Sequence, residues 1–242
     1  MIDPTSRVEA YRAAREHVLA RIADACARAG RATAEVSLVA VSKTVAAEAL
    51  RDAVAAGLDR LGENRVQEGA SKAPEVPGAR WELIGPLQSN KARRALEVFD
   101  AIQTVHTVEL ARRLDRLVPE VRPGEPYPVL VQVNVDEDPA KAGFAVVDLD
   151  AALPDLLGLR HLAVRGLMTV GRLTADATEA RRTFQGLRAL SERSRARWPE
   201  LGPELSMGMT DDFELAIEEG ATIVRVGRAL FGERHHPHEP HG

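Results

Sequence analysis

The sequence predicts a (β/α)₈ barrel of the TIM type, an α/β fold, and three observations favour this class. The chain has 242 residues, and α/β barrels commonly occupy about 250 residues as one unit. Hydrophobic residues make up 45% of the chain, enough apolar surface to offset the entropy lost on folding. Short apolar runs alternate with longer segments of helical periodicity, the pattern expected of successive βα units around a parallel sheet.

The expected strands are short runs of mostly apolar residues. The runs at 36–41 and 129–133 are nearly continuous in apolar or β-branched residues, which is typical of strands covered on both faces. The eight predicted strands are 36–42, 58–62, 81–84, 101–105, 129–134, 164–169, 204–207 and 222–226.

The segments between these runs carry Ala, Leu, Arg and Glu at helical spacings and are long enough for crossover helices. An extra amphipathic helix is expected at 7–29, ending near Gly30 and preceding the first strand. We expect it to fill the place left by the short tail after the eighth strand. The predicted crossover helices are 46–56, 65–70, 90–98, 108–117, 147–157, 175–197 and 212–219.

No Ser/Gly-rich linker or change of composition divides the chain, so residues 1–232 are expected to form a single domain. Residues 233–242 are rich in histidine, but prolines interrupt the histidines. Such a terminus forms no preorganised metal site. We therefore expect a disordered tail and no functional metal.

Charge and composition limit the partners and the compartment. With a net charge of -4, the chain offers no general attraction to nucleic acid or to an anionic membrane. The first six residues lack the basic and apolar regions of a secretory signal, and no apolar run approaches the ~20 residues that span a bilayer. Cys26 is the lone cysteine and forms no internal disulfide. These features favour a reducing, cytoplasmic setting.

The loops after the seventh and eighth strands are the expected phosphate-binding segments, because parallel barrels bind phosphate there. Ser206 lies at the end of the seventh run, and Gly208 and Thr210 follow it and lead into a helix, whose N-terminus attracts anions. Arg225 and Gly227 end the eighth run, supplying charge and close backbone approach.

Taken singly, these residues also have ordinary structural explanations. Gly208 and Gly227 would make tight turns, and Thr210 would cap the following helix. Asp211 and Asp212 would repel a phosphate dianion, so phosphate binding requires their carboxylates to point away from it.

Lys43 ends the first apolar run, at the mouth where strands one and eight adjoin. Partial desolvation there would lower its pKa and leave a neutral amine that can attack an aldehyde. The alternative is a lysine that reaches solvent or pairs with Glu63. The other lysines are less well placed: Lys72 is expected in a polar loop, Lys91 at a helix start and Lys141 in the loop after the fifth strand.

An ordered set of motifs along almost the whole chain resembles one family, the pyridoxal 5′-phosphate (PLP) homeostasis proteins of the YggS/PROSC type. Any one motif is weak, but the ordered set is highly specific. The motifs are AVSK at 40–43, GENRVQE at 62–68, IGPLQSNK at 84–91, KAGF at 141–144, GLMT at 166–169, SMGMTDD at 206–212, RVG at 225–227 and LFG at 230–232.

The resemblance implies the barrel of the N-terminal domain of alanine racemase, fold type III among PLP proteins. It implies that Lys43 carries PLP covalently as a Schiff base, and that Arg225 lies near the ring and phosphate, where its charge would keep the pyridine nitrogen unprotonated. Met168 lies in a matching motif, and Asn64 is expected to hydrogen-bond PLP or line its pocket. The matching phosphate-binding residues are Ser206, Gly208, Thr210 and Gly227.

The function implied is a carrier that holds PLP, protects its aldehyde and passes it to apo-enzymes that depend on PLP. The first alternative is an amino-acid racemase, which needs a second base on the opposite face of the substrate. Tyr11 and Tyr127 are poorly placed for that task and no further domain follows, so only weak racemisation is expected. The second alternative, an aldolase with a Schiff-base lysine and no cofactor, leaves the full motif set unexplained.

Two positions depart from the family's usual pattern. Thr210 stands where serine is commoner, and it keeps the hydroxyl. Pro86 stands where histidine or another polar residue often occurs, and it removes a backbone donor at the mouth of the third strand. His106, at the end of the fourth predicted strand, is assigned no role.

Overall fold

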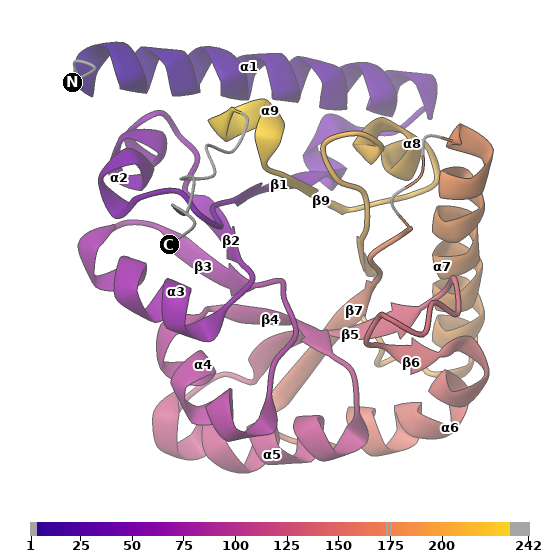
Figure 1. Ribbon diagram of the computed structural model, residues 1–242. Coiled ribbons are helices and arrows are strands. Elements are labelled where there is room, and N and C mark those ends of the chain that lie inside the picture. Colours follow the sequence, from indigo (N-terminus) through magenta and orange to yellow (C-terminus); the bar gives the residue numbers. More distant parts are fainter. Residues whose placement is uncertain (1–3, 173, 175, 233–242) are drawn as a thin grey trace, which may run out of the picture.

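The computed structural model describes residues 4–172, 174 and 176–232, and within them eight parallel strands close into a barrel (Figure 1). Each strand pairs with its neighbours in the order β4-β3-β2-β1-β9-β8-β7-β5, and pairing of β4 with β5 completes the ring. The barrel strands are β1 (Ser37–Val41), β2 (Arg60–Glu63), β3 (Arg80–Leu83), β4 (Ala101–Val105), β5 (Tyr127–Asn134), β7 (Leu162–Met168), β8 (Glu204–Ser206) and β9 (Ile223–Val226). The predicted fold class is confirmed, and every predicted strand overlaps one of these eight.

The differences from the predicted strands have local causes. The second strand starts at Arg60 and not at residue 58, because the amide of Leu58 still bonds the carbonyl of Ala53 and so completes the end of the preceding helix. A two-residue strand, β6 (Phe144–Ala145), lies where a loop was expected and pairs with the end of β5.

Helices surround the barrel, as the alternating pattern predicts (Figure 1). A short helix after the eighth barrel strand, α9, was not predicted. The predicted helix starting at 108 continues to Val121, four residues beyond the predicted end. The helices are α1 (Pro4–Arg28), α2 (Ala47–Ala55), α3 (Val66–Lys72), α4 (Ala92–Val98), α5 (Val108–Val121), α6 (Val146–Leu157), α7 (Ala177–Arg197), α8 (Phe213–Glu218) and α9 (Arg228–Phe231).

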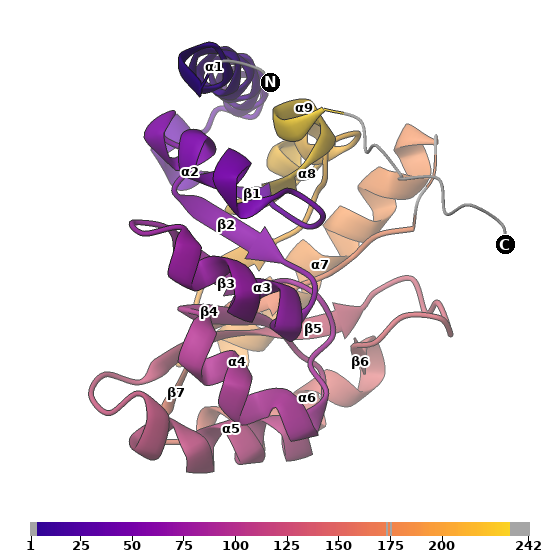
Figure 2. The ribbon, with the colours of Figure 1, turned by 60° about the vertical axis from the view of Figure 1, so that its left-hand side comes forward.

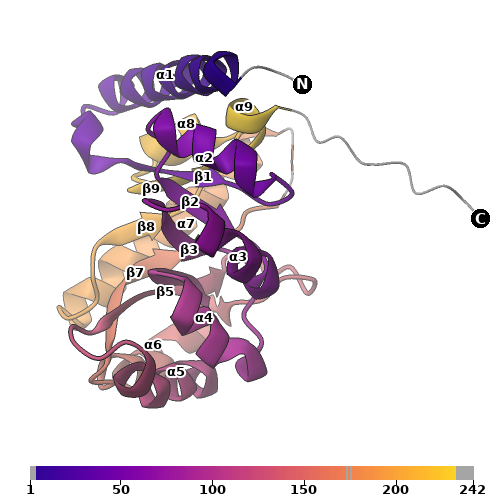
Figure 3. The ribbon, with the colours of Figure 1, turned by 90° about the vertical axis from the view of Figure 1, so that its left-hand side faces the viewer.

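The long helix α1 covers the side of the barrel where the last strand, β9, pairs with the first strand, β1. It lies across α2, α8 and α9, seen along its length in Figure 1, nearly end-on in Figure 2 and obliquely in Figure 3. Arg21 pairs with Glu214 at 2.5 Å, and Tyr11 meets Phe231 edge-on with ring centroids 5.6 Å apart. Since α9 has only four residues, α1 supplies the cover that a full eighth helix would give, as expected from the sequence.

Most of the apolar core lies between the strands and the helices, and a much smaller apolar cluster lies inside the barrel. The inner cluster consists of Val39, Leu130, Met168 and Ile223. The remaining inward positions hold several polar side chains, which form the network described below.

No helix within the described ranges is long and apolar enough to cross a membrane. The histidine-rich segment 233–242 lies outside the described residues, so the expectation for it stands as a prediction.

Candidate functional site

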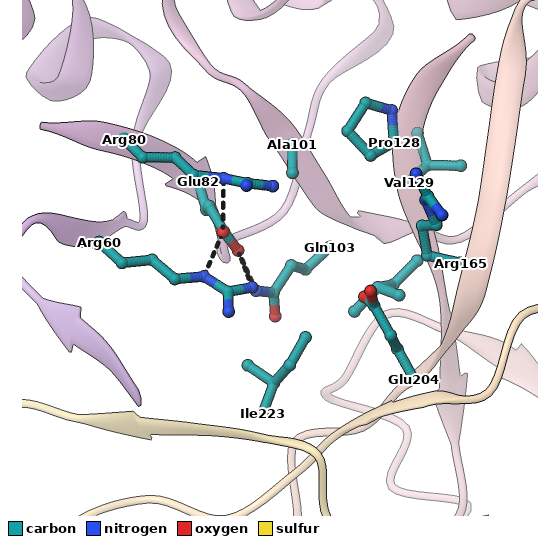
Figure 4. Close-up of a pocket in the computed structure, with 11 residues that line it drawn as sticks. Arg60, Arg80, Glu82, Ala101, Gln103, Pro128, Val129, Arg165, Glu204 and Ile223 are labelled. Carbon is teal, nitrogen blue, oxygen red and sulfur yellow. Dashed lines mark hydrogen bonds and ion pairs between the residues drawn. The ribbon is translucent and has the colours of Figure 1, made fainter. Parts of the chain in front are cut away.

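The amino-terminal mouth of the barrel holds a charged cavity of about 260 Å³ (Figure 4). On one wall, Glu82 accepts hydrogen bonds from Arg60 at 2.5 and 3.3 Å and lies 3.5 Å from Arg80. Arg165 and Glu204 lie on the opposite wall. In TIM barrels this face contributes mainly to stability, whereas chemistry takes place at the carboxyl ends of the strands. We therefore locate the candidate site at the other end.

A chain of hydrogen bonds runs through the barrel from this mouth toward the carboxyl ends of the strands. Gln103 donates to Glu82 at 2.5 Å and accepts a bond from the Ser206 hydroxyl at 2.6 Å. Ser206 in turn accepts a bond from Arg225 at 2.6 Å. Side chains on four different strands thus form one network that fixes the Arg225 guanidinium.

Arg225 is a buried cation whose hydrogen-bond acceptors are neutral. Its side chain is 4% exposed, and besides Ser206 it donates to the carbonyl oxygen of Thr169 at 2.8 Å. Within the described ranges no carboxylate lies within ion-pair distance of it. Burial lowers the pKa of Arg225 to about 10, so the group still carries its charge at neutral pH. A buried charge without an ion-pair partner is costly and is characteristic of functional sites.

The loops that follow β8 and β9 lie against each other at the same end. The Gly227 amide donates to the Thr210 hydroxyl at 3.2 Å, so the sequence-based alternative of Thr210 as a helix cap is not observed. Gly208 adopts a φ of 90°, and a Cβ there would lie 2.6 Å from the Ala216 side chain. The amides of Gly208 and Thr210 bond no acceptor in the described part of the chain. Two backbone donors therefore remain available for an anion.

Of the two aspartates after this loop, only Asp211 points outward as phosphate binding requires, whereas Asp212 bonds the loop itself. Asp211 is exposed and pairs with Arg228. Asp212 accepts a hydrogen bond from the Met209 amide at 2.6 Å. Burial raises the pKa of Asp212, although the Met209 amide and the charge of Arg225 oppose this shift.

Asp212→Asn is expected to stabilise the protein more at pH 7 than at pH 4. The raised pKa means that the Asp212 carboxyl group binds its proton more tightly in the folded protein than in the unfolded chain. The contribution of Asp212 to the free energy of unfolding therefore falls as the pH rises above the ordinary Asp pKa of about 3.9. Asparagine keeps an acceptor for Met209 but never ionises. Urea unfolding measures the free energy of unfolding at each pH. The difference between the variant and wild type should shift in favour of the variant by up to about 1 kcal/mol from pH 4 to pH 7.

The matched control for this measurement is Asp211→Asn, which changes the exposed neighbouring carboxylate. A stability difference between Asp212→Asn and wild type that stays constant from pH 4 to pH 7 would contradict the burial argument.

Lys43 follows β1 at the carboxyl-terminal mouth, beside the loop after β9. In the pairing of these strands Ala40 lies opposite Val226, and a Cβ on Gly227 would lie 3.4 Å from that of Val41. Lys43 lies in the turn two residues beyond Val41, the last residue of β1. Lys43 and the β8 and β9 loops are therefore at the same end of the barrel.

The expectation for Lys72 was wrong. It is the last residue of α3 and only 8% exposed, not part of a polar loop. Its amine donates to Glu63 at 2.7 Å, to Glu68 at 2.6 Å and to the carbonyl oxygen of Ser42 at 3.0 Å. Glu63, the partner considered for Lys43, is thus paired with Lys72. Pro74, two residues later, suggested a loop. In the structure the helix continues to Lys72, whose amine bonds buried acceptors.

The remaining sequence-predicted residues lie around the same mouth. Asn64 is half-buried directly after β2, and its side chain makes no hydrogen bond within the described ranges. Met168 is fully buried in the inner apolar cluster. His106 contacts the carbonyl oxygen of Thr104 at 3.0 Å through Nδ1, and Pro86 lies in the loop after β3.

Sequence reasoning missed Gln103 and the cluster around Lys72. The available signal was polar residues inside otherwise apolar runs. Gln103 interrupts the fourth run, and Glu63 follows the second directly. In a strand that is buried on both faces, such a residue must find a partner.

Comparison with known proteins places the chain in a family. The model for the N-terminal domain of alanine racemase matches residues 18–235. A pyridoxal phosphate homeostasis protein from Pseudomonas aeruginosa is 44% identical over 220 residues, which cover 90% of this chain and 93% of that protein. The chain belongs to the pyridoxal phosphate homeostasis protein family.

Solved structures agree with membership of the pyridoxal phosphate homeostasis protein family. PipY of Synechococcus elongatus, whose structure has PLP bound, matches with a TM-score of 0.77 and 42% identity, covering 87% of this chain and 100% of PipY. An alanine racemase from Corynebacterium glutamicum has a TM-score of 0.72 at 17% identity. This chain covers 63% of that racemase, and the likeness concerns the fold alone.

Proposed function

We propose that this protein binds PLP through a covalent bond to Lys43 and acts in intracellular PLP homeostasis without efficient catalysis. The observation that carries the proposal is Arg225, a buried guanidinium with neutral acceptors, at the mouth that also holds Lys43 and two backbone amides with no acceptor in the part of the chain that the structure describes. The PLP-bound relative and the homeostasis protein at 44% identity support this assignment.

The residues fit the chemistry of PLP. The cofactor supplies an aldehyde, which condenses with an unprotonated amine to form a C=N bond and release one water. Lys43 Nζ would provide the amine. The Gly208 and Thr210 amides, with the loop at Gly227, would hold the phosphate, and Ser206 would position Arg225 through its hydroxyl.

Arg225 would set the electronic state of the ring. A guanidinium stays charged at neutral pH, so a pyridine nitrogen beside it is held unprotonated. An unprotonated ring withdraws electrons weakly, which disfavours carbanion chemistry. Asn64 and Met168 would line the pocket.

The two tyrosines offer no second base for racemisation. Tyr127 begins β5, at the opposite end of the barrel, where its hydroxyl donates to the carbonyl oxygen of Phe99 at 2.7 Å. Burial strongly raises the pKa of Tyr127. Tyr11 lies on α1, against Phe231. These positions favour a PLP carrier over an efficient racemase.

The proposed setting is the cytoplasm, and the proposed recipients of PLP are apo-enzymes that depend on it. Residues 1–232 would act as a single PLP-binding domain. The net charge of -4 makes nucleic acid or an anionic membrane a poor partner.

Borohydride reduction of the purified, PLP-loaded protein tests the proposal. Mass spectrometry after proteolysis should find the reduced adduct on the Lys43 peptide, and a racemisation assay on several amino acids should show no efficient turnover. An adduct on a different lysine would overturn the assignment of Lys43. Rapid racemisation would instead identify an enzyme.

A further inference from the structure

A cluster of charged side chains on α3 holds the backbone on both sides of Lys43. The amine of Lys72 donates to the carbonyl oxygen of Ser42 at 3.0 Å, and the amide of Thr44 donates to Glu68 at 2.7 Å. These two groups belong to the peptide bonds that precede and follow Lys43. Both peptide planes are therefore tied to the same helix.

Ion pairs join the charged members of this cluster to one another. Lys72 bridges Glu68 at 2.6 Å and Glu63 at 2.7 Å, and the Ser42 hydroxyl adds a further bond to Glu63 at 2.8 Å. Glu63 and Ser42 are fully buried. A buried ionic cluster of this kind is maintained only with close geometry, so it fixes its attached backbone groups firmly.

The backbone at Thr44 is in a conformation that needs such support. Its φ is 67°, in the left-handed region that β-branched residues rarely adopt. Strained residues of this kind persist where surrounding contacts hold them. Here the Val45 amide closes the turn on the carbonyl oxygen of Ser42 at 3.0 Å, and the bond from the Thr44 amide to Glu68 ties that turn to α3.

We infer that Glu68 and Lys72 are positioning residues that clamp the turn around Lys43 and so hold its amine ready for PLP. The inference rests on the proposed role of Lys43. Neither residue was assigned a part in PLP binding by the motif analysis. The clamp reduces the conformational freedom lost when PLP binds, which strengthens binding without any contact to the ligand.

Glu68→Ala tests the clamp, because it removes the bond to Thr44 while leaving the buried pair of Lys72 and Glu63. Hydrogen exchange of the PLP-free protein should show the Thr44 amide exchanging about tenfold faster or more. PLP affinity should fall by about fivefold to tenfold. Glu68→Gln keeps an acceptor for the Thr44 amide and should recover most of both properties.

The control is Glu75→Ala, an exposed carboxylate in the segment after α3, which should resemble wild type. If Glu68→Ala does not yield folded protein, Glu68→Asp provides the same test, because its shorter side chain withdraws from Thr44. Wild-type PLP affinity in a folded Glu68→Ala or Glu68→Asp variant would overturn the clamp. The absence of a PLP adduct on wild-type Lys43 would overturn the proposed function instead. In that case the hydrogen-exchange rate of the Thr44 amide in the PLP-free variants would still show whether the clamp exists.

Discussion

Lys43→Ala is expected to abolish the near-visible absorption band that wild-type protein acquires with PLP. The band of the imine lies at a longer wavelength than that of the free aldehyde and requires a C=N bond between PLP and an amine, which alanine does not supply. The phosphate contacts of the β8 and β9 loops would remain, so the variant should still bind PLP weakly and without a covalent bond. Absorption spectra during PLP titration measure the band, and dialysis should remove the PLP from the variant.

Lys91→Ala is a suitable control, since it removes one of only four lysines, at the end of the 3₁₀ turn that leads into α4. Its spectrum should match that of wild type. Persistence of the band in Lys43→Ala after dialysis would show that a different amine carries PLP, and would remove the basis of the proposed site.

Arg225→Leu is expected to weaken PLP binding by about 100-fold, or about 2.7 kcal/mol. The guanidinium is the buried positive charge at the site, and bonds from a charged donor are the stronger ones. The PLP-free variant should be as stable as wild type or more stable by about 1–2 kcal/mol, because leucine removes a buried charge whose described hydrogen-bond acceptors are both neutral. Opposite effects on binding and stability would identify a residue kept for function.

Fluorescence titration with PLP and urea unfolding of the PLP-free protein measure the two effects. Arg225→Lys retains a charge but not the planar fork that bonds Ser206 and Thr169, so its affinity should lie between those of wild type and Arg225→Leu. Unchanged PLP affinity in Arg225→Leu would contradict the role assigned to this charge.

The barrel could be predicted because its signals are local and repeated. Parallel strands that are buried on both faces must be apolar, and the helices outside them need one apolar face, so the alternation is written along the chain. Strand ends were less certain. Leu58 was predicted to begin a strand, but in the structure its amide completes the end of α2.

Part of the site could also be predicted. Parallel strands bring their carboxyl ends to one mouth, so Lys43, Ser206 and Arg225 had to share it once the barrel was assumed. The function of the Ser206 hydroxyl was not predictable, since its partners Gln103 and Arg225 come from distant strands.

The sequence by itself determined the parallel barrel, the end at which chemistry is possible and the lysine that ends the first strand. Only the tertiary structure decided that Lys72 is a buried member of a cluster, that Arg225 has no carboxylate at ion-pair distance among the described residues, and that α3 holds the backbone beside Lys43. The physical reason is that periodicity records which face of an element is buried. Pairing between polar groups depends on distances across the barrel that no local pattern contains.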